Sequence, residues 1–257
     1  MWCLAYSSSI DADDTVVETL PGISTNYLGF RNDVPPFTDP LLRRAVALAL
    51  DPVAICAEAG IDRAALGGIL PPAMPGHTPR MGRQRDVDAA RRLLDEAGHA
   101  GGRGLPPLRI VLPFWLKGRR VIQEQLAEIG LAVEAVERTD RPLSICDSLR
   151  DHEAQMWVAG WTADFPDPDG FLRGLFETDL LLHRIDDDLR AGLAQARSLT
   201  DQQERLRLYH RLDRELVTER AVLVPLGYGR TTLLRRPWLA GLSVNPISLM
   251  QLERVVR

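Results

Sequence analysis

The sequence contains almost no lysine. Of its 31 basic residues only Lys117 is a lysine, so thirty are arginines. A phosphate-binding P-loop needs Gly-Lys-Ser/Thr, and Gly118 follows Lys117, which excludes that class of nucleotide-binding protein. Schiff-base chemistry would depend on this one lysine. The arginines are scattered among 35 acidic residues, giving a net charge of −4, so the composition does not favour nucleic-acid binding.

Cysteines and long apolar runs are also scarce. Cys3, Cys56 and Cys146 stand far apart without a Cys-x-x-Cys pair, which argues against zinc or dithiol redox chemistry. Apolar runs stay well short of the roughly 20 residues of a membrane span. The first ten residues lack the basic start and apolar core of a signal peptide, so we expect a soluble chain without a secretion signal. Its 257 residues suit one large or two modest domains.

Complete catalytic motifs are lacking. Gly241-Leu242-Ser243 breaks off before it forms a Gly-x-Ser-x-Gly nucleophile elbow. His152-Glu153 lacks the second histidine of a zinc helix, and Gly227-Tyr228-Gly229 has Thr232 in place of the third glycine of a dinucleotide loop. The five histidines without metal-ligand spacing are His77, His99, His152, His183 and His210. We therefore expect no catalytic residue, no metal and no cofactor.

Strand and helix patterns alternate along the chain, which predicts an α/β protein. Asp39-Pro40 and Asp51-Pro52 each predict a helix start, because aspartate accepts free N–H groups and proline tolerates the first helical position. The second of these helices ends near Gly60, and Asp86 or Asp88 starts another, closed by Gly98. Further helices are expected at 117–129, 185–198 and 201–218, and strands at 25–30, 108–113, 131–136, 155–159 and 222–226.

Two connections in this pattern carry more specific expectations. The strand–helix–strand run over 108–136 predicts a crossover between parallel strands. The Gly/Pro-rich loop over 67–85 is apolar for a surface loop, so we expect it to pack against or line something.

The segment Gly160–Leu172, Gly-Trp-Thr-Ala-Asp-Phe-Pro-Asp-Pro-Asp-Gly-Phe-Leu, concentrates residue types that bind ligands. EF-hand spacing fails, because alignment on Gly170 puts an aromatic residue at the first ligand position. A structural explanation is a strand-to-helix connection in which Asp169 caps the next helix. It leaves Trp161 and Asp164 unexplained at the end of an α/β strand, where ligands usually bind. A partly buried carboxylate beside an indole suits a small ammonium group, which makes Asp164 the candidate ligand contact.

Several short motifs also follow one another in a fixed order along nearly the whole chain. They are Tyr27–Phe30, Pro35–Asp39, Arg43–Asp51, Pro71–Gly76, Ala89–Gly98, Gln125–Gly130, Gly160–Leu172, Arg205–Tyr209 and Val224–Leu226. In this order they resemble the bacterial family 5 solute-binding proteins, the oligopeptide- and dipeptide-binding receptors of ABC importers.

The resemblance implies an α/β, periplasmic-binding-protein-like lobe with a mixed sheet flanked by helices. Residues 1–30 would be a crossing strand from a first lobe, 31–221 the second lobe, and 222–257 a return strand and tail. The chain would cover only the C-terminal portion of the family's length, with a largely missing first lobe. A stretch before the late helices, at 177–184, is shorter than in the family. Crossing strands without their usual neighbours would favour partner pairing or aggregation.

The implied function is capture of a peptide or similar small amine-bearing solute, without chemistry, for delivery to ABC permease subunits. In the peptide-binding members the matching aspartate pairs with the ligand's α-ammonium group, which gives Asp164 that role here, with Trp161 and Thr162 beside it. Arg31 and Arg173 both remain open as partners of the ligand's carboxylate. The resemblance implies the periplasm or cell envelope. An alternative is an effector-sensing C-terminal domain of a cytoplasmic transcription regulator or signalling protein.

Overall fold

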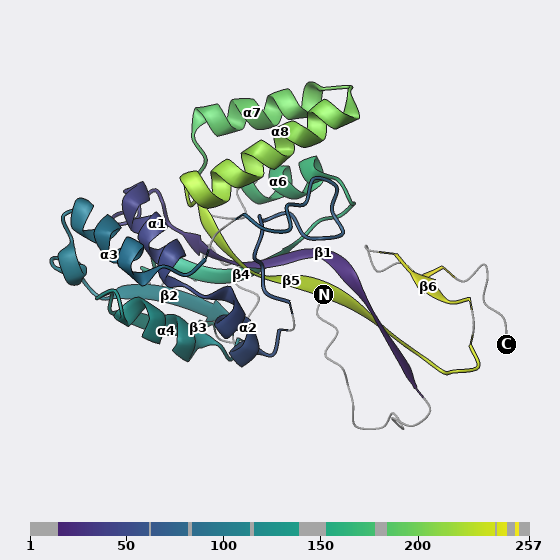
Figure 1. The fold of residues 1–257 in the computed structure, drawn as a ribbon, viewed down its shortest axis with the longest axis horizontal. Helices are drawn as coiled ribbons and strands as arrows, with labels where there is room; N and C mark the ends of the chain where they lie inside the picture. Colours follow the sequence, from purple (N-terminus) through teal and green to yellow (C-terminus); the bar gives the residue numbers. More distant parts are fainter. Residues whose placement is uncertain are drawn as a thin grey trace.

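The computed structural model describes residues 15–61, 63–81, 84–113, 116–138, 153–177, 184–239, 241–245 and 250–251. Its main sheet has five strands in the order β3-β2-β4-β1-β5 (Figure 1). Their bounds are β1 Val16–Phe30, β2 Leu108–Pro113, β3 Val133–Arg138, β4 Met156–Thr162 and β5 Leu223–Arg235. Strand β2 is parallel to β3 and β4, whereas β1 is antiparallel to β4 and β5. The sheet is therefore mixed, as expected, and the predicted parallel pairing across 108–136 is confirmed.

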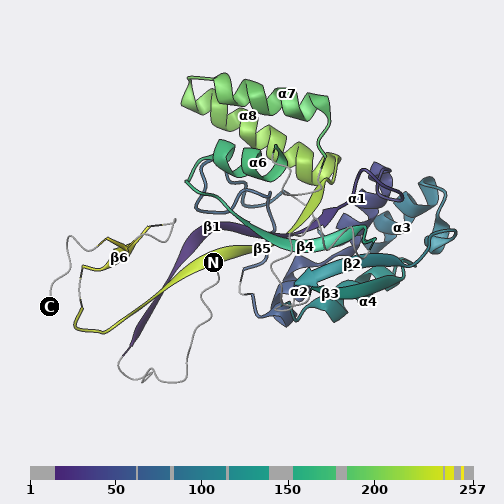
Figure 2. The same cartoon turned by 180° about the vertical axis from the view of Figure 1, so that it is seen from behind.

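Helices cover both faces of this sheet (Figures 1 and 2). On one face lie α1 Pro40–Ala49, α2 Pro52–Ala59, α3 Val87–Glu96 and α4 Arg119–Ala127. On the other lie α6 Pro168–Phe176, α7 Asp187–Ser198 and α8 Gln202–Arg214, which a π-helical turn extends over Glu215–Glu219. Short elements complete the description: a 3₁₀ turn at Ala100–Gly102, and β6 Ser243–Val244 paired with β7 Met250–Gln251. Among the described helices, none has the length and apolar character needed to cross a membrane.

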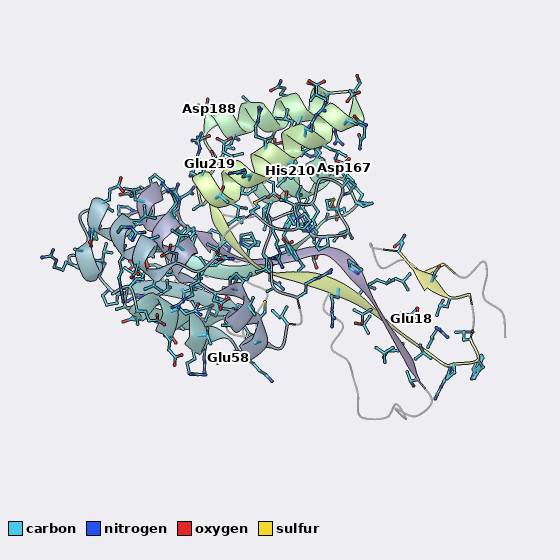
Figure 3. All side chains as sticks on the ribbon, viewed as in Figure 1. Glu18, Glu58, Asp167, Asp188, His210 and Glu219 are labelled. Carbon is cyan, nitrogen blue, oxygen red and sulfur yellow. The ribbon has the colours of Figure 1, made fainter. Side chains whose placement is uncertain are left out.

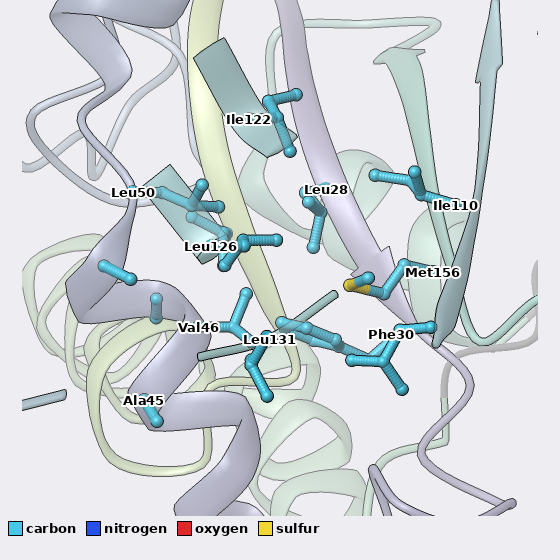
Figure 4. Packing of buried hydrophobic residues seen from close by; sticks show 14 of the residues in the cluster. Leu28, Phe30, Ala45, Val46, Leu50, Ile110, Ile122, Leu126, Leu131 and Met156 are labelled. Carbon is cyan, nitrogen blue, oxygen red and sulfur yellow. The ribbon is translucent and has the colours of Figure 1, made fainter. Parts of the chain in front are cut away.

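Alternate residues of the strands enter two separate hydrophobic clusters. Tyr27 and Trp157 point to the cluster under α6–α8, while Leu28 and Val158 point to the cluster under α1–α4. Figure 4 shows part of the second cluster, where Leu28 packs with residues from α1, α4 and β2. This alternation follows from the two-residue period of a strand and buries both faces of the sheet.

The capping predictions for α1, α2 and α3 agree with the structure. Asp39 and Asp51 each accept a hydrogen bond from the backbone N–H two residues later, and a proline follows each cap. Gly60 ends α2 with φ of 69°, the left-handed conformation that glycine adopts without steric cost. Of the two candidates for the start of α3, Asp86 is the cap. The predicted helices are all present, with ends shifted by a few residues.

Three predicted strands are longer than the sequence pattern indicated. Strand β1 begins at Val16 and not at Thr25, and two others continue further at their C-terminal ends. Strand β4 does not stop at Ala159 but runs through Gly160 to Thr162, and β5 extends nine residues beyond Leu226 to Arg235. The extra length of β5 pairs with the N-terminal half of β1, so neither segment is a loop. Tertiary pairing, which a local pattern does not contain, sets both ends.

The long β1–β5 pair divides into two halves, here called the lobe half and the ribbon. In the lobe half, Ser24–Phe30 lies between β4 and β5. In the ribbon, Val16–Pro21 pairs with Arg230–Arg235 and leaves the body of the molecule as a two-stranded extension (Figure 1). A β-bulge separates the halves, because three residues of β1, Gly22–Ser24, lie opposite Gly229 alone.

Candidate functional site

Strand β4 ends where the ribbon leaves the lobe, and two of the predicted site residues are its last two residues. Trp161 pairs in register with Thr25, and Thr162 pairs with Ser24. The Trp161 ring is half-buried and packs against α6, where a Cβ on Gly174 would lie 2.4 Å from the ring atom Cζ2. The indole Nε1 is buried and has no hydrogen-bond partner among the described residues. Thr162, on the opposite side of the strand, is exposed.

Asp164 lies two residues beyond β4, in the turn that leads to α6. Its side chain is exposed rather than partly buried, and within the described ranges it makes no hydrogen bond or ion pair. The expected partial burial beside the indole is therefore wrong, because the Trp161 ring turns toward α6 instead. Asp164 is therefore a carboxylate that a turn presents without a partner from the described residues, and it can accept hydrogen bonds from a cationic group.

The residue that caps α6 is Asp167 and not Asp169, which corrects the expectation. The Asp167 carboxylate accepts a hydrogen bond from the Asp169 N–H at 2.8 Å, and Pro168 occupies the first helical position. The same carboxylate accepts two hydrogen bonds from Arg205 of α8, at 2.6 and 2.8 Å. These Arg205 hydrogen bonds hold the pKa of Asp167 below its ordinary value. Figure 3 labels Asp167 beside α6 and α8.

A second set of contacts lies where the ribbon joins the lobe half, a place here called the base of the ribbon. The backbone of Gly68–Leu70 crosses this region, and residues of both long strands donate to it: Thr25 Oγ1 to the Ile69 carbonyl at 2.8 Å, and Tyr228 Oη to the Gly68 carbonyl at 2.9 Å. Thr25 pairs with both Trp161 and Tyr228, so the three lie in one row across β4, β1 and β5. The apolar 67–85 loop therefore packs against the start of the ribbon, as predicted.

Helix α8 reaches the same loop through a buried carboxyl group. Asp213 is fully buried, and its Oδ1 accepts the Ile69 N–H at 2.8 Å. Its Oδ2 has no partner among the described residues and faces Gly68, where a Cβ would lie 1.8 Å away. Burial raises the pKa of Asp213 to about 7, against the lowering effect of the Ile69 and Leu70 N–H groups. Helix α8 thus contacts both the turn of Asp164, through Arg205, and the base of the ribbon.

The two arginines left open as carboxylate partners lie in different places. Arg31 follows β1 at the far end of β4 and forms an ion pair with Asp33 at 2.9 Å. It is about eight residues of extended strand from Asp164, or roughly 26 Å, and the structure does not bring the two together. Arg173 on α6 lies 3.8 Å from Asp169.

Other residues noted in the sequence have structural environments or lie outside the described ranges. Cys56 is buried, its Sγ lies 3.2 Å from the Leu226 carbonyl, and burial raises the pKa of its thiol to about 11. Groups of three or more potential metal ligands do not occur in the part of the chain that the structure describes. Among the residues singled out in the sequence, those outside the described ranges are Cys3, Cys146, His152 and 178–183, which includes His183. Residues 1–14 of the expected crossing strand and 246–249 and 252–257 of the expected tail also lie outside these ranges.

Three features of this region were missed in the sequence: the Asp167–Arg205 pair, the Gly68–Leu70 contacts and Asp213. Asp167-Pro168 repeats the pattern of the two helix starts that were recognised, so the correct cap was available from the sequence. The contacts of Asp167 with Arg205, of Asp213 with Ile69 and of Tyr228 with Gly68 join residues 38 to 160 positions apart, so no local sequence pattern predicts them.

Comparison with solved structures defines the class of fold. The chain superposes on HbpA2 from Haemophilus parasuis with a TM-score of 0.81 at 21% identity, covering 95% of this chain and 50% of that one. It superposes on a dipeptide-binding protein from Pseudoalteromonas sp. SM9913, solved in complex with Met-Leu, with a TM-score of 0.73 at 22% identity, over 96% and 51% of the two chains. The architecture is that of a periplasmic binding-protein lobe, which confirms the predicted fold class.

Sequence comparison then gives the family. The model of the bacterial extracellular solute-binding proteins, family 5 Middle, matches residues 5–179, and the chain belongs to this family. The probable di/tripeptide-binding protein 5 of Pseudomonas aeruginosa is 28% identical over 255 residues, which cover 93% of this chain and 47% of that protein. The periplasmic oligopeptide-binding protein OppA of Escherichia coli is 24% identical over 86% of this chain and 42% of its own length. The chain thus spans about half the length of the curated relatives it matches.

These relatives bear on the two functions that the sequence left open. Members of the family are solute-binding proteins, and the relatives named here are binding proteins for small solutes. The alternative of an effector-sensing regulator domain is not favoured by any of them.

Proposed function

We propose that the chain is a substrate-binding component of an ABC importer, or part of one, that captures a peptide or similar amine-bearing solute without chemistry. The observation that carries the proposal is the exposed Asp164 carboxylate at the junction of lobe and ribbon, which pairs with no residue that the structure describes. A carboxylate in this state accepts a charge-assisted hydrogen bond from an ammonium group without first breaking an internal ion pair. The peptide-binding names of the relatives support this ligand class.

Trp161 and Thr162 complete the proposed site. Thr162 exposes a hydroxyl on the strand that leads to Asp164, and Trp161 supports the start of the turn by packing against α6. The ligand would be passed to ABC permease subunits in the membrane, and the place of action would be the periplasm or cell envelope, as the name of the E. coli relative indicates for that protein.

The test compares two peptides that differ only in the proposed contact. Trialanine and N-acetyl-trialanine are titrated into the isotope-labelled full chain, and binding is followed by amide chemical shifts. We expect the free amine to bind about tenfold more tightly, because the acetyl group removes the positive charge. Asp164→Asn should abolish the difference, whereas Asp188→Asn, at an exposed position of α7, should keep it. Equal affinities of the two peptides for the unaltered chain would contradict the proposal.

A further inference from the structure

The position of Asp164 is set by the turn around it, since its own side chain makes no hydrogen bond or ion pair in the described ranges. Two anchors of this turn are local. The Ala163 N–H donates to the Ile23 carbonyl of β1 at 3.1 Å. The ring of Phe165 covers Gly170 of α6, where a Cβ would lie 2.5 Å from the ring atom Cζ. Together these anchors fix the strand side of the turn and the residue after Asp164.

The third anchor comes from a distant part of the sequence. Arg205 of α8 donates two parallel hydrogen bonds to the Asp167 carboxylate, at 2.8 and 2.6 Å. A bidentate pair of this kind fixes orientation as well as distance. The Arg205 side chain is 14% exposed and that of Asp167 is 31% exposed, so the pair is partly shielded from solvent.

Arg205 is itself held in place before any ligand arrives. Its guanidinium carbon lies 5.0 Å from the ring centre of the buried Tyr209, one turn later on α8. The Tyr209 hydroxyl donates to Asp169 Oδ1 at 3.2 Å, so α8 contacts two residues of the α6 N-terminus. The hydrogen bonds to Asp167 also raise the pKa of Arg205, so the guanidinium stays charged at neutral and alkaline pH.

We propose that Arg205 is the positioning residue for Asp164. Its two hydrogen bonds to Asp167 keep the 163–167 turn in the geometry that presents Asp164 to a ligand ammonium group. This rests on the proposed function. Binding then needs no reordering of the turn, which is the energetic benefit of preorganisation. The chemistry of Arg205 matters for this role, because a lysine keeps the charge but cannot form two parallel hydrogen bonds.

The first arm of the test needs no ligand. Amide hydrogen exchange of Ala163 and Asp167, whose N–H groups donate to the Ile23 and Phe165 carbonyls, is measured in the full chain and in Arg205→Met, Arg205→Lys and Asp167→Asn. Asparagine caps a helix as well as aspartate does, so Asp167→Asn weakens the arginine contact while keeping the α6 cap. We expect exchange to rise about tenfold in Arg205→Met and about threefold in the other two. Arg120→Met, which removes a pair with Glu124 on the distant α4, should leave exchange at both amides unchanged. Unchanged exchange in Arg205→Met would overturn the inference.

The second arm separates positioning from general structural support. The affinity ratio of trialanine to N-acetyl-trialanine is measured for the same variants. Loss of structure alone weakens both peptides by one factor and keeps the ratio, whereas a displaced Asp164 lowers the ratio itself. We expect the ratio to fall at least threefold in Arg205→Met and to be partly restored in Arg205→Lys. If the Arg205 variants keep the affinity ratio of the unaltered chain, the inference is overturned. If Asp164→Asn keeps the ratio of the unaltered chain, the proposed function is overturned instead.

Discussion

The two halves of the β1–β5 pair share one hydrogen-bonding pattern but differ in what surrounds them. In the lobe half, Tyr27, Leu28 and Phe30 are fully buried, since β4 pairs on the other edge of β1 and helices cover both faces. In the ribbon, Val17 and Leu234 lie opposite each other and are 61% and 43% exposed. Backbone pairing therefore does not decide how much a residue contributes to stability. The layers packed on the strand decide it.

The largest expected difference comes from the same truncation in each half. Leu28→Ala removes a fully buried side chain and should lower the free energy of unfolding by about 2–5 kcal/mol. Leu234→Ala, on the exposed face of the ribbon, should change it by no more than about 0.5 kcal/mol. Urea unfolding followed by circular dichroism measures both. Similar losses in the two variants would show that the ribbon is as tightly packed as the lobe, contrary to the comparison.

The loop that packs against the base of the ribbon is expected not to tolerate a single added methyl group at Gly68. In Gly68→Ala the new Cβ would meet three atoms of the buried Asp213 carboxyl group within 2.6 Å, and a hydrogen bond to Ile69 holds that group in place. We expect a loss of about 1–3 kcal/mol in the free energy of unfolding. The control is Gly192→Ala in α7, where the Cβ meets only the tip of the Leu212 side chain and helix propensity favours alanine.

A gain of stability in Gly68→Ala, or a loss no larger than that of Gly192→Ala, would mean that the loop moves freely over Asp213. The contacts at the base of the ribbon would then not fix the boundary.

Asp213 also makes the free energy of unfolding depend on pH. Its pKa is raised to about 7 in the folded chain from an ordinary value of 3.8, so the folded state holds the proton more tightly. The stability this confers is fully present below about pH 4 and is lost as the pH rises through about 7. Asp213→Asn should remove this dependence between pH 4 and 7. Urea unfolding across that range, for the unaltered chain and the variant, measures the difference between their slopes.

Asp167 and Asp33 have pKa values below their ordinary value of 3.8. Their contributions to the free energy of unfolding therefore change only in acid, near or below that pH, and do not mimic the effect of Asp213. Parallel pH profiles of the unaltered chain and Asp213→Asn would contradict the assignment.

The same division explains what the sequence allowed us to predict. Helix starts with a local signal, such as Asp39-Pro40 and Asp51-Pro52, were found, because a cap is a contact between near neighbours in sequence. The exception is Asp167-Pro168, which carries the same signal but was not chosen as the cap of α6. The ends of β4 and β5 were placed too early, because the residues that continue them, such as Thr162 and Leu234, are stabilised only by pairing with β1. Local apolar patterns describe the lobe half well and the ribbon poorly.

The candidate site shows a similar limit. The carboxylate was found from residue type and its place at a strand end, and the resemblance indicated the same residue. Its support was not found, since Arg205 is one of thirty arginines and nothing local distinguishes it. Asp213 gave no signal either, because a carboxylate on a helix predicts an exposed face and only the fold buries it. Long-range contacts between polar residues remain the part of this site that the sequence conceals.

The smallest expected effect lies within the ribbon and concerns its ion pair. Glu18 Oε1 accepts hydrogen bonds from Arg235, and the closest nitrogen lies at 2.7 Å, with both side chains partly exposed. Glu18→Gln should therefore lower the free energy of unfolding by no more than about 1 kcal/mol, and the loss should shrink in about 1 M salt. Amide exchange should rise in 16–21 and 230–235 while the lobe half keeps its protection, because the bulge at Gly22–Ser24 separates the two. If faster exchange spread from the ribbon into Tyr27 and Leu28, the halves would unfold as one unit, and the bulge would mark a bend in the strand rather than a boundary of stability.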